Sequence, residues 1–122
     1  MTEEETGNVA TIEAYLAALA EGAGSEVLRR FFTDDALQVE LPNRLNPQGG
    51  QGDLETLLQR AEQGRKLLRS QTYEVRSVLA RGDRVAVEAS WTGTLAVPLG
   101  TLEAGAAMRA HFAMFFELES KR

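Results

Sequence analysis

The spacing of apolar residues changes along the chain, and this change constrains the fold more than any other feature. Up to about residue 64 the apolar side chains recur mainly every three or four positions, which is typical of amphipathic helices. From residue 71 onward they mostly alternate with polar side chains, which is typical of strands that bury one face. Helices segregated in this way from an antiparallel sheet indicate an α+β fold.

Capping and turn residues place the expected elements along the chain. Gly22 suits the end of a first helix, Ser25 and Asp53 suit the N-caps of two others, and Gly64 suits the end of the last. The turn at 81–83 should join two long strands. The expected helices are 9–22, 25–32 and 53–64. The expected strands are 36–41, which alternation predicts to be half-buried, 71–80, 84–95 and 106–118.

Composition narrows the class of protein. The 122 residues suit one domain, expected over residues 9–122 after a flexible lead-in at 1–8. Without cysteine, and with one histidine, a thiolate or histidine-rich metal centre is excluded, so we expect no metal and no cofactor. A net charge of −5 has the wrong sign for generic nucleic-acid binding, and no apolar run reaches the length of a membrane helix. We therefore expect a cytoplasmic domain that binds neither nucleic acid nor membrane.

Three segments carry a resemblance to a known superfamily: Ile-Glu-Ala-Tyr-Leu-Ala-Ala-Leu at 12–19, Phe-Phe-Thr-Asp-Asp-Ala at 31–36, and the strand from Gly82 to Gly93 with its Glu-x-x-Trp-Thr-Gly ending. The chain resembles the nuclear transport factor 2-like superfamily, which includes ketosteroid isomerase, scytalone dehydratase, limonene epoxide hydrolase and the SnoaL-like polyketide cyclases. The SnoaL-like branch is the most similar. The resemblance implies a cone-shaped, curved antiparallel sheet packed against three N-terminal helices, enclosing an apolar pocket.

The end of the chain departs from this pattern. Relatives generally carry one more strand after a turn at the position of residues 119–122, where this chain ends. Loss of that strand would expose a sheet edge and open the pocket wall. We expect that the native protein is longer, or else that a neighbouring chain covers the edge, and we prefer the first.

Tyr15 is the most specific candidate for a catalytic residue. It resembles the helix-1 tyrosine of ketosteroid isomerase, which donates a hydrogen bond to the developing dienolate oxygen, and such a donor is effective in a dry pocket. A core tyrosine would fit the pattern equally well. The isomerase's proton-shuttling aspartate corresponds to Leu41, and its second donor to Phe112 or Met114. A leucine cannot shuttle a proton, so the resemblance argues against that isomerase's mechanism.

Two kinds of residue could replace the missing base. Glu40 and Glu88 are carboxylates, but alternation places both opposite the apolar face of their strands, and hence towards solvent. Histidine is the residue type whose ordinary pKa suits acid–base work near neutrality, and His111 is the only histidine in the sequence. We favour an outward position for His111, together with Arg109, at a dimer surface, and the inward position stays open.

Apolar and aromatic residues are the candidates for ligand contact. Trp91 is expected to line the pocket, where an indole can stack on a flat ligand, although a core tryptophan would look the same. Tyr73 could be a second phenol in the pocket, but a role as sheet filler is favoured. The expected substrate-binding residues are Trp91, Phe32, Leu41, Phe112 and Met114.

Three functions follow, in order of preference. The first is a SnoaL-like enzyme performing cofactor-free acid–base chemistry (isomerisation, cyclisation, dehydration or hydrolysis) on an apolar, ring-containing substrate. Tyr15 would be its donor or acid, and His111, or Glu40 in reserve, its base. The second is a binding module that holds a small apolar ligand without reaction. The third is a homodimeric scaffold, with Gln38, Glu40, Arg109 and His111 at a sheet-to-sheet interface.

Overall fold

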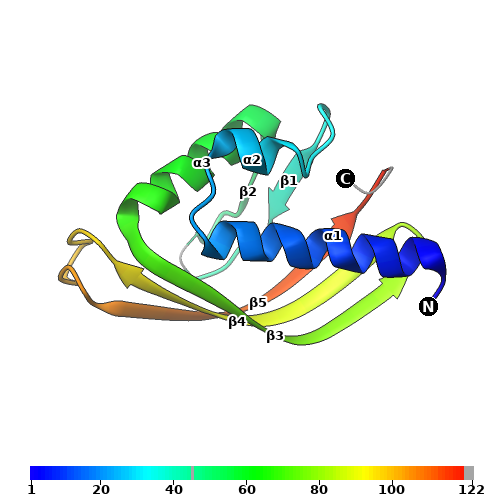
Figure 1. Cartoon of the computed structure of the whole chain (residues 1–122). Helices are drawn as coiled ribbons and strands as arrows, with labels where there is room; N and C mark the ends of the chain where they lie inside the picture. Colours follow the sequence, from blue (N-terminus) through cyan, green and yellow to red (C-terminus); the bar gives the residue numbers. More distant parts are fainter. Residues whose placement is uncertain (45, 120–122) are drawn as a thin grey trace.

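The computed structural model describes residues 1–44 and 46–119, and within them the chain forms three helices and five strands (Figure 1). None of the described helices is both long and apolar enough to cross a membrane. The helices are α1 (Glu3–Ala20), α2 (Ser25–Arg29) and α3 (Leu54–Leu67). The strands are β1 (Leu37–Glu40), β2 (Gly50–Asp53), β3 (Leu68–Arg81), β4 (Arg84–Leu95) and β5 (Ala107–Glu117). The expectation of an α+β fold is confirmed.

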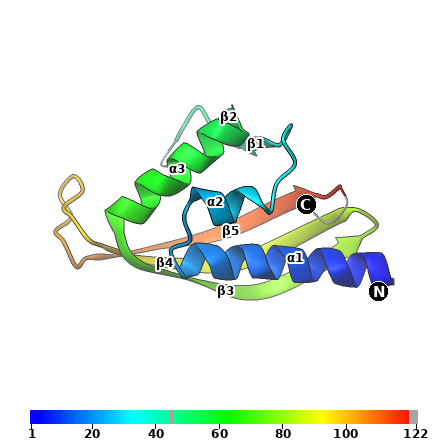
Figure 2. The same ribbon diagram turned by 45° about the horizontal axis from the view of Figure 1, so that its top comes forward.

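The three long strands form one antiparallel sheet in the order β3-β4-β5. Figure 1 shows that the sheet is strongly curved and that α1 lies along its concave side, and in Figure 2 α2 lies between α1 and α3. We call the side towards α1 the inner face; on β4 it carries Val85, Val87, Ala89 and Trp91, most of which are buried. The other side, the outer face, carries the intervening residues of β4 such as Glu88.

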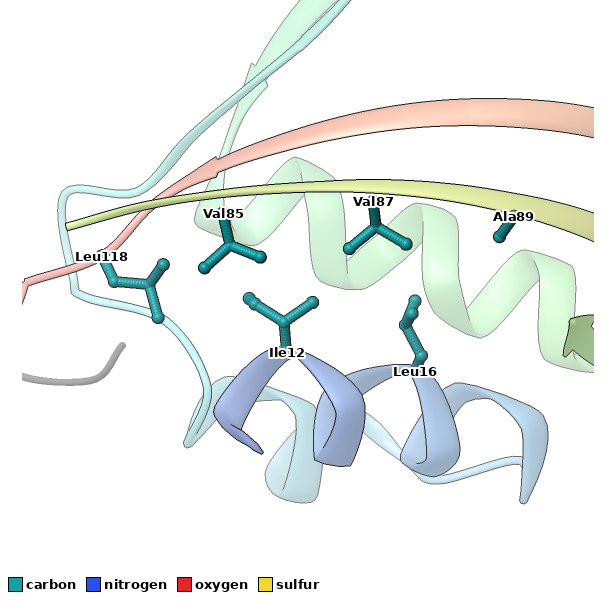
Figure 3. Close-up of a cluster of buried hydrophobic side chains, with 6 residues drawn as sticks. All are labelled: Ile12, Leu16, Val85, Val87, Ala89 and Leu118. Atoms are coloured by element: carbon teal, nitrogen blue, oxygen red, sulfur yellow. The ribbon is translucent and has the colours of Figure 1, made fainter. Parts of the chain in front are cut away.

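Two clusters of buried side chains hold the layers together. In the first, Figure 3 shows Ile12 and Leu16 of α1 pointing at β4, where Val85, Val87 and Ala89 meet them. Leu118, just after β5, closes one end of this cluster. The second cluster joins the helices to one another, and its buried members are Ala18, Leu28, Leu54, Leu57 and Leu58. The apolar spacing of the sequence is thus satisfied on both α1 and α3.

The first helix begins earlier than the apolar pattern predicts. Residues 3–8, expected as a flexible lead-in, are helical because Thr2 and Glu5 form a capping box. The Glu5 carboxylate also accepts from the backbone N–H of Gly82, and these hydrogen bonds lower the pKa of Glu5. Asn8, which is buried, donates to the Gly82 carbonyl at 3.1 Å. The start of α1 is therefore fastened to the β3–β4 turn.

The first two strands differ from the expectation. Alternation predicts a half-buried strand at 36–41, but β1 is exposed along its whole length because it pairs only with β2, in a separate two-stranded sheet. No layer of described residues covers its apolar side. Strand β2 covers the end of the expected loop at 43–52 and extends to Asp53. Its Gly-Gln-Gly sequence has little strand propensity of its own and depends on pairing with β1.

Several other element boundaries agree closely, although α2 ends at Arg29 and is three residues shorter than the expected helix at 25–32. Strand β4 spans 84–95 as predicted, and Asp53 caps α3 by accepting from the Thr56 N–H at 2.9 Å. Gly22, with φ of 76°, follows α1 as expected. Helix α3 continues through Gly64 to Leu67 and passes directly into β3, which therefore starts three residues early. The turn expected at 119–122 lies outside the described residues apart from Glu119.

Candidate functional site

Aromatic side chains gather around Tyr15 on the inner face. The Tyr15 ring lies 5.3 Å from the Phe32 ring and 5.7 Å from the Phe31 ring, measured between centroids. Phe116, from the inner face of β5, lies 6.3 Å away and edge-on. Tyr15 also packs against both clusters of buried side chains, so it stands where the helices and the sheet meet. Its phenol is therefore positioned by contacts on several sides.

The Tyr15 hydroxyl is an unused hydrogen-bond donor. It makes no hydrogen bond to any other described residue, and since no described side-chain oxygen is both fully buried and unpartnered, it keeps some access to solvent. Burial of the phenol, with a smaller contribution from Tyr73, raises the pKa of Tyr15 to about 12. The group is consequently protonated at neutral pH and available to donate to an oxygen atom of a ligand.

Tyr73 lies level with Tyr15 on the facing strand. Helix α1 and strand β3 run in opposite directions (Figure 1), and Gln71 fixes their alignment by donating to the Leu19 carbonyl at 3.0 Å. Tyr73 lies two residues beyond Gln71 on β3, which is about 7 Å along the strand. Tyr15 lies one helical turn before Leu19 on α1, which is about 6 Å in the same direction in space. Burial raises the pKa of Tyr73 as well, so a second protonated phenol faces the same region.

Trp91 is held in one orientation beside these phenols. Its indole N–H donates to the Gln71 side-chain oxygen at 2.9 Å, and Phe112 meets its ring edge-on at 6.2 Å. The indole also lies over Gly93, where an added Cβ would come within 2.5 Å of a ring carbon. Gln71 thus ties the tryptophan to the end of α1. The resulting inner-face site, as we call it below, consists of Tyr15, Tyr73, Trp91, Gln71, Phe32 and Phe112.

Replacing Gly93 by alanine should displace the indole. A Cβ at 2.5 Å from the ring cannot be accommodated, so Trp91 must turn and give up its hydrogen bond to Gln71. Because Trp91 is the only tryptophan, the change should appear as a shift of the emission maximum and a loss of near-ultraviolet circular dichroism. Gly64→Ala is the matched control, since apart from the adjacent residues and the backbone of its own helix no atom lies within 4 Å of a Cβ there. Equal spectra for the two variants would contradict this packing.

The two phenols should lose their protons at a higher pH than an exposed tyrosine does. They are the only tyrosines, so tyrosinate absorbance near 295 nm reports on them alone. In Tyr73→Phe the midpoint of Tyr15 should still lie well above pH 10, because burial remains after the smaller contribution of Tyr73 is lost, and in Tyr15→Phe the midpoint of Tyr73 should also exceed 10. The folded chain holds these protons more tightly than the unfolded chain, so the free energy of unfolding should fall as pH rises from about 10 towards 12. If both tyrosines titrate with a single midpoint at pH 10 while circular dichroism shows an intact fold, the phenols are not buried as described.

The three candidate bases lie away from the inner-face site. His111 is on the outer face, where its Nε2 atom lies 2.8 Å from a carboxylate oxygen of Glu88. The condition for His111 as base, that it faces inward, is therefore not met. Glu40 ends β1 and accepts from the side-chain amides of Asn43 and Asn46. The structure brings none of the three bases into contact with Tyr15.

The expected ligand-contacting residues fall into two groups. Phe32 contacts Tyr15, Phe112 contacts Trp91, and Met114 packs on the first cluster of buried side chains from the inner face of β5. Leu41, which follows β1, is 75% exposed and lies outside these contacts. Gln71 was missed by the sequence analysis. Its position, two residues before Tyr73 on the same face of a strand, was the available signal.

The family follows from comparison with known proteins. The model of the SnoaL-like domain family matches residues 12–122, nearly the whole chain. The chain belongs to the SnoaL-like domain family. This confirms the resemblance drawn from the sequence. A search of curated proteins finds no match.

Solved structures share the fold of this SnoaL-like domain. A candidate SnoaL-like polyketide cyclase from Jannaschia sp. CCS1 has a TM-score of 0.78 at 20% identity, over 100% of this chain and 83% of that one. IdmH, a candidate polyketide cyclase from Streptomyces antibioticus, has a TM-score of 0.76 at 22% identity, and the match covers 94% of this chain and 85% of IdmH. An LEH-like epoxide hydrolase from M. tuberculosis has a TM-score of 0.76 at 13% identity, and the match covers 98% of this chain and 78% of that one.

Proposed function

We propose that the inner-face site binds a small, mostly apolar, ring-containing compound and assists a cofactor-free acid–base reaction on it. The observation that carries the proposal is the Tyr15 hydroxyl, which is protonated, held by aromatic neighbours and without a hydrogen-bond partner among the described residues. A donor held in this way stabilises negative charge that develops on a carbonyl oxygen when a neighbouring carbon loses a proton. Isomerisation, cyclisation and dehydration each develop such a charge when they begin with loss of a proton next to a carbonyl group.

The surrounding residues favour a ring-bearing ligand. Trp91 presents an indole fixed by Gln71 and Phe112, and a fixed aromatic ring can pack on a planar ligand without losing side-chain freedom on binding. Phe112 itself is exposed although it lies on the inner face, so apolar surface remains uncovered beside the indole. Two of the solved structures named above are candidate polyketide cyclases and the third is an epoxide hydrolase, which agrees with this proposal.

A second function, a binding module without catalysis, is supported by the positions of the candidate bases. His111 and Glu88 pair with each other on the outer face, and Glu40 is engaged by two asparagine side chains. No described carboxylate or imidazole is shown in contact with Tyr15. A site that can donate a hydrogen bond but has no base of its own would hold a ligand more readily than it would transform it.

Solvent-deuterium exchange separates the two functions. The probe is 1-tetralone, a bicyclic ketone whose α-protons exchange slowly in neutral D₂O, and its proton NMR spectrum is followed with and without protein. Exchange above the buffer rate that is lost in Tyr15→Phe supports the enzyme. Quenching of Trp91 emission by the ketone without added exchange supports the binding module. If neither is seen, the inner face is not a site for this class of ligand.

A further inference from the structure

Gln71 connects two parts of the inner-face site that belong to different layers of the fold. Its side-chain N–H donates to the Leu19 carbonyl in the last turn of α1 at 3.0 Å, and its side-chain oxygen accepts from the Trp91 indole N–H at 2.9 Å. A carbonyl can only accept and an indole N–H can only donate, so the orientation of the amide between them is fixed. One amide group therefore links the first helix to the tryptophan of β4.

The hydrogen bond to Gln71 decides which edge of the indole faces α1. Among the described residues, Gln71 is the only hydrogen-bond partner of the Trp91 side chain. Phe112 meets the ring edge-on, and the ring lies over Gly93, which has no side chain to engage it. Such van der Waals contacts keep the ring close to the sheet but are not directional, whereas a hydrogen bond is. Without Gln71 the indole could turn over Gly93.

The other hydrogen bond of Gln71 acts on the helix that carries the proposed donor. Leu19 lies one helical turn after Tyr15 on α1, and Trp91 pairs across the strands with Tyr73, which is level with Tyr15. Figure 1 shows α1 lying across the sheet here. Gln71 consequently holds the Tyr15 helix and the indole in one fixed relation, so that a ligand whose oxygen accepts from Tyr15 meets the indole in a defined orientation.

We propose that Gln71 is a positioning residue that sets the ring specificity of the site. By fixing the indole relative to α1, it favours ligands with a flat aromatic ring fused beside the carbonyl group over ligands with a puckered, saturated ring. A fixed indole packs on a flat ring without losing side-chain freedom on binding, and a puckered ring presents no flat face to it. This inference rests on the proposed function, and in it Gln71 acts through Trp91 and takes no part in proton transfer.

Equilibrium dialysis with two ketones measures the specificity. The probes are 1-tetralone, which has a fused aromatic ring, and cyclohexanone, which has none, and both are quantified by gas chromatography. Gln71→Met removes both hydrogen bonds at similar side-chain length. It should reduce the preference for 1-tetralone, expressed as the ratio of the two dissociation constants, by about 2- to 10-fold, the cost of ordering one released side chain. Gln59→Met, at an exposed position of α3, is the control and should keep the wild-type ratio.

Spectra taken without ligand separate positioning from loss of the fold. The near-ultraviolet circular dichroism of Trp91, the only tryptophan, should weaken in Gln71→Met and stay unchanged in Gln59→Met, while both variants keep the far-ultraviolet spectrum of the wild type. An unchanged near-ultraviolet spectrum in Gln71→Met would show that Gln71 does not hold the indole, and the proposal would be wrong.

Trp91→Phe tests whether Gln71 acts through the indole. Phenylalanine has no N–H to donate, so in this background Gln71→Met should leave the ratio of dissociation constants unchanged. An equal fall of the ratio with and without the indole would overturn the proposal. It would also be overturned, with the proposed function still standing, by a wild type that binds 1-tetralone without preference or by a Gln71→Met variant that keeps the full preference. A wild type that binds neither ketone would overturn both.

Discussion

Tyr15→Phe should lower turnover by about 10²-fold or more on any ring-containing ketone that the protein transforms. The substitution removes one hydroxyl and leaves the ring that packs against Phe31, Phe32 and Phe116, so the fold should be retained. The substitution should lower kcat more than it changes KM, because the hydrogen bond strengthens as charge develops on the substrate oxygen. Steady-state kinetics, with exchange of 1-tetralone protons as the first assay, measures it.

Tyr73→Phe is the matched control for this prediction. It removes the other phenol from the same face, at a position level with Tyr15, and leaves an equally apolar ring. If Tyr15 is the principal donor, the Tyr73 variant should lose much less activity than the Tyr15 variant. Equal rates for wild type and Tyr15→Phe would end the catalytic role of Tyr15, whatever the behaviour of the control.

Leu28→Ala should lower the free energy of unfolding by about 2–5 kcal/mol. Leu28 of α2 is only 2% exposed and belongs to the second cluster, together with the buried leucines of α3. Truncation leaves a cavity between α2 and α3. Urea unfolding monitored by circular dichroism measures the loss. The variants are compared with one common value for the dependence of the free energy of unfolding on urea concentration.

The same substitution at an exposed leucine is the comparison. Leu41 is 75% exposed, so Leu41→Ala should change stability by about 0.5 kcal/mol or less. A similar loss for both variants would show that the second cluster does not stabilise the fold as described. A large loss of stability for Leu41→Ala alone would show that the apolar side of β1 is covered in solution.

Local signals were sufficient to predict most of the fold. The alternation of Val85, Val87 and Ala89 identified the buried face of β4, because the sheet is covered on one side only. The glycine after α1 and the aspartate before α3 marked their ends, since each serves a cap that short-range geometry requires. The first turn of α1 was missed because it contains no apolar pattern, although Thr2 and Glu5 have the spacing of a capping box.

Less of the candidate site could be predicted, because it depends on which face of a strand is covered. Strand β5 carries phenylalanine on both faces, Phe112 and Phe116 inside and Phe115 outside, so its alternation could not decide the position of His111. The exposure of β1 depends on a pairing partner in a glycine-rich segment. The link from Trp91 through Gln71 to α1 joins residues far apart in sequence, and no local pattern announces it.

A crystal structure of the protein with 1-tetralone bound tests the central claim most directly. The account predicts the ketone on the inner face, with its carbonyl oxygen within hydrogen-bond distance of the Tyr15 hydroxyl and its rings against Trp91. A ketone bound only on the outer face, or one on the inner face whose oxygen points away from both phenols, would contradict it.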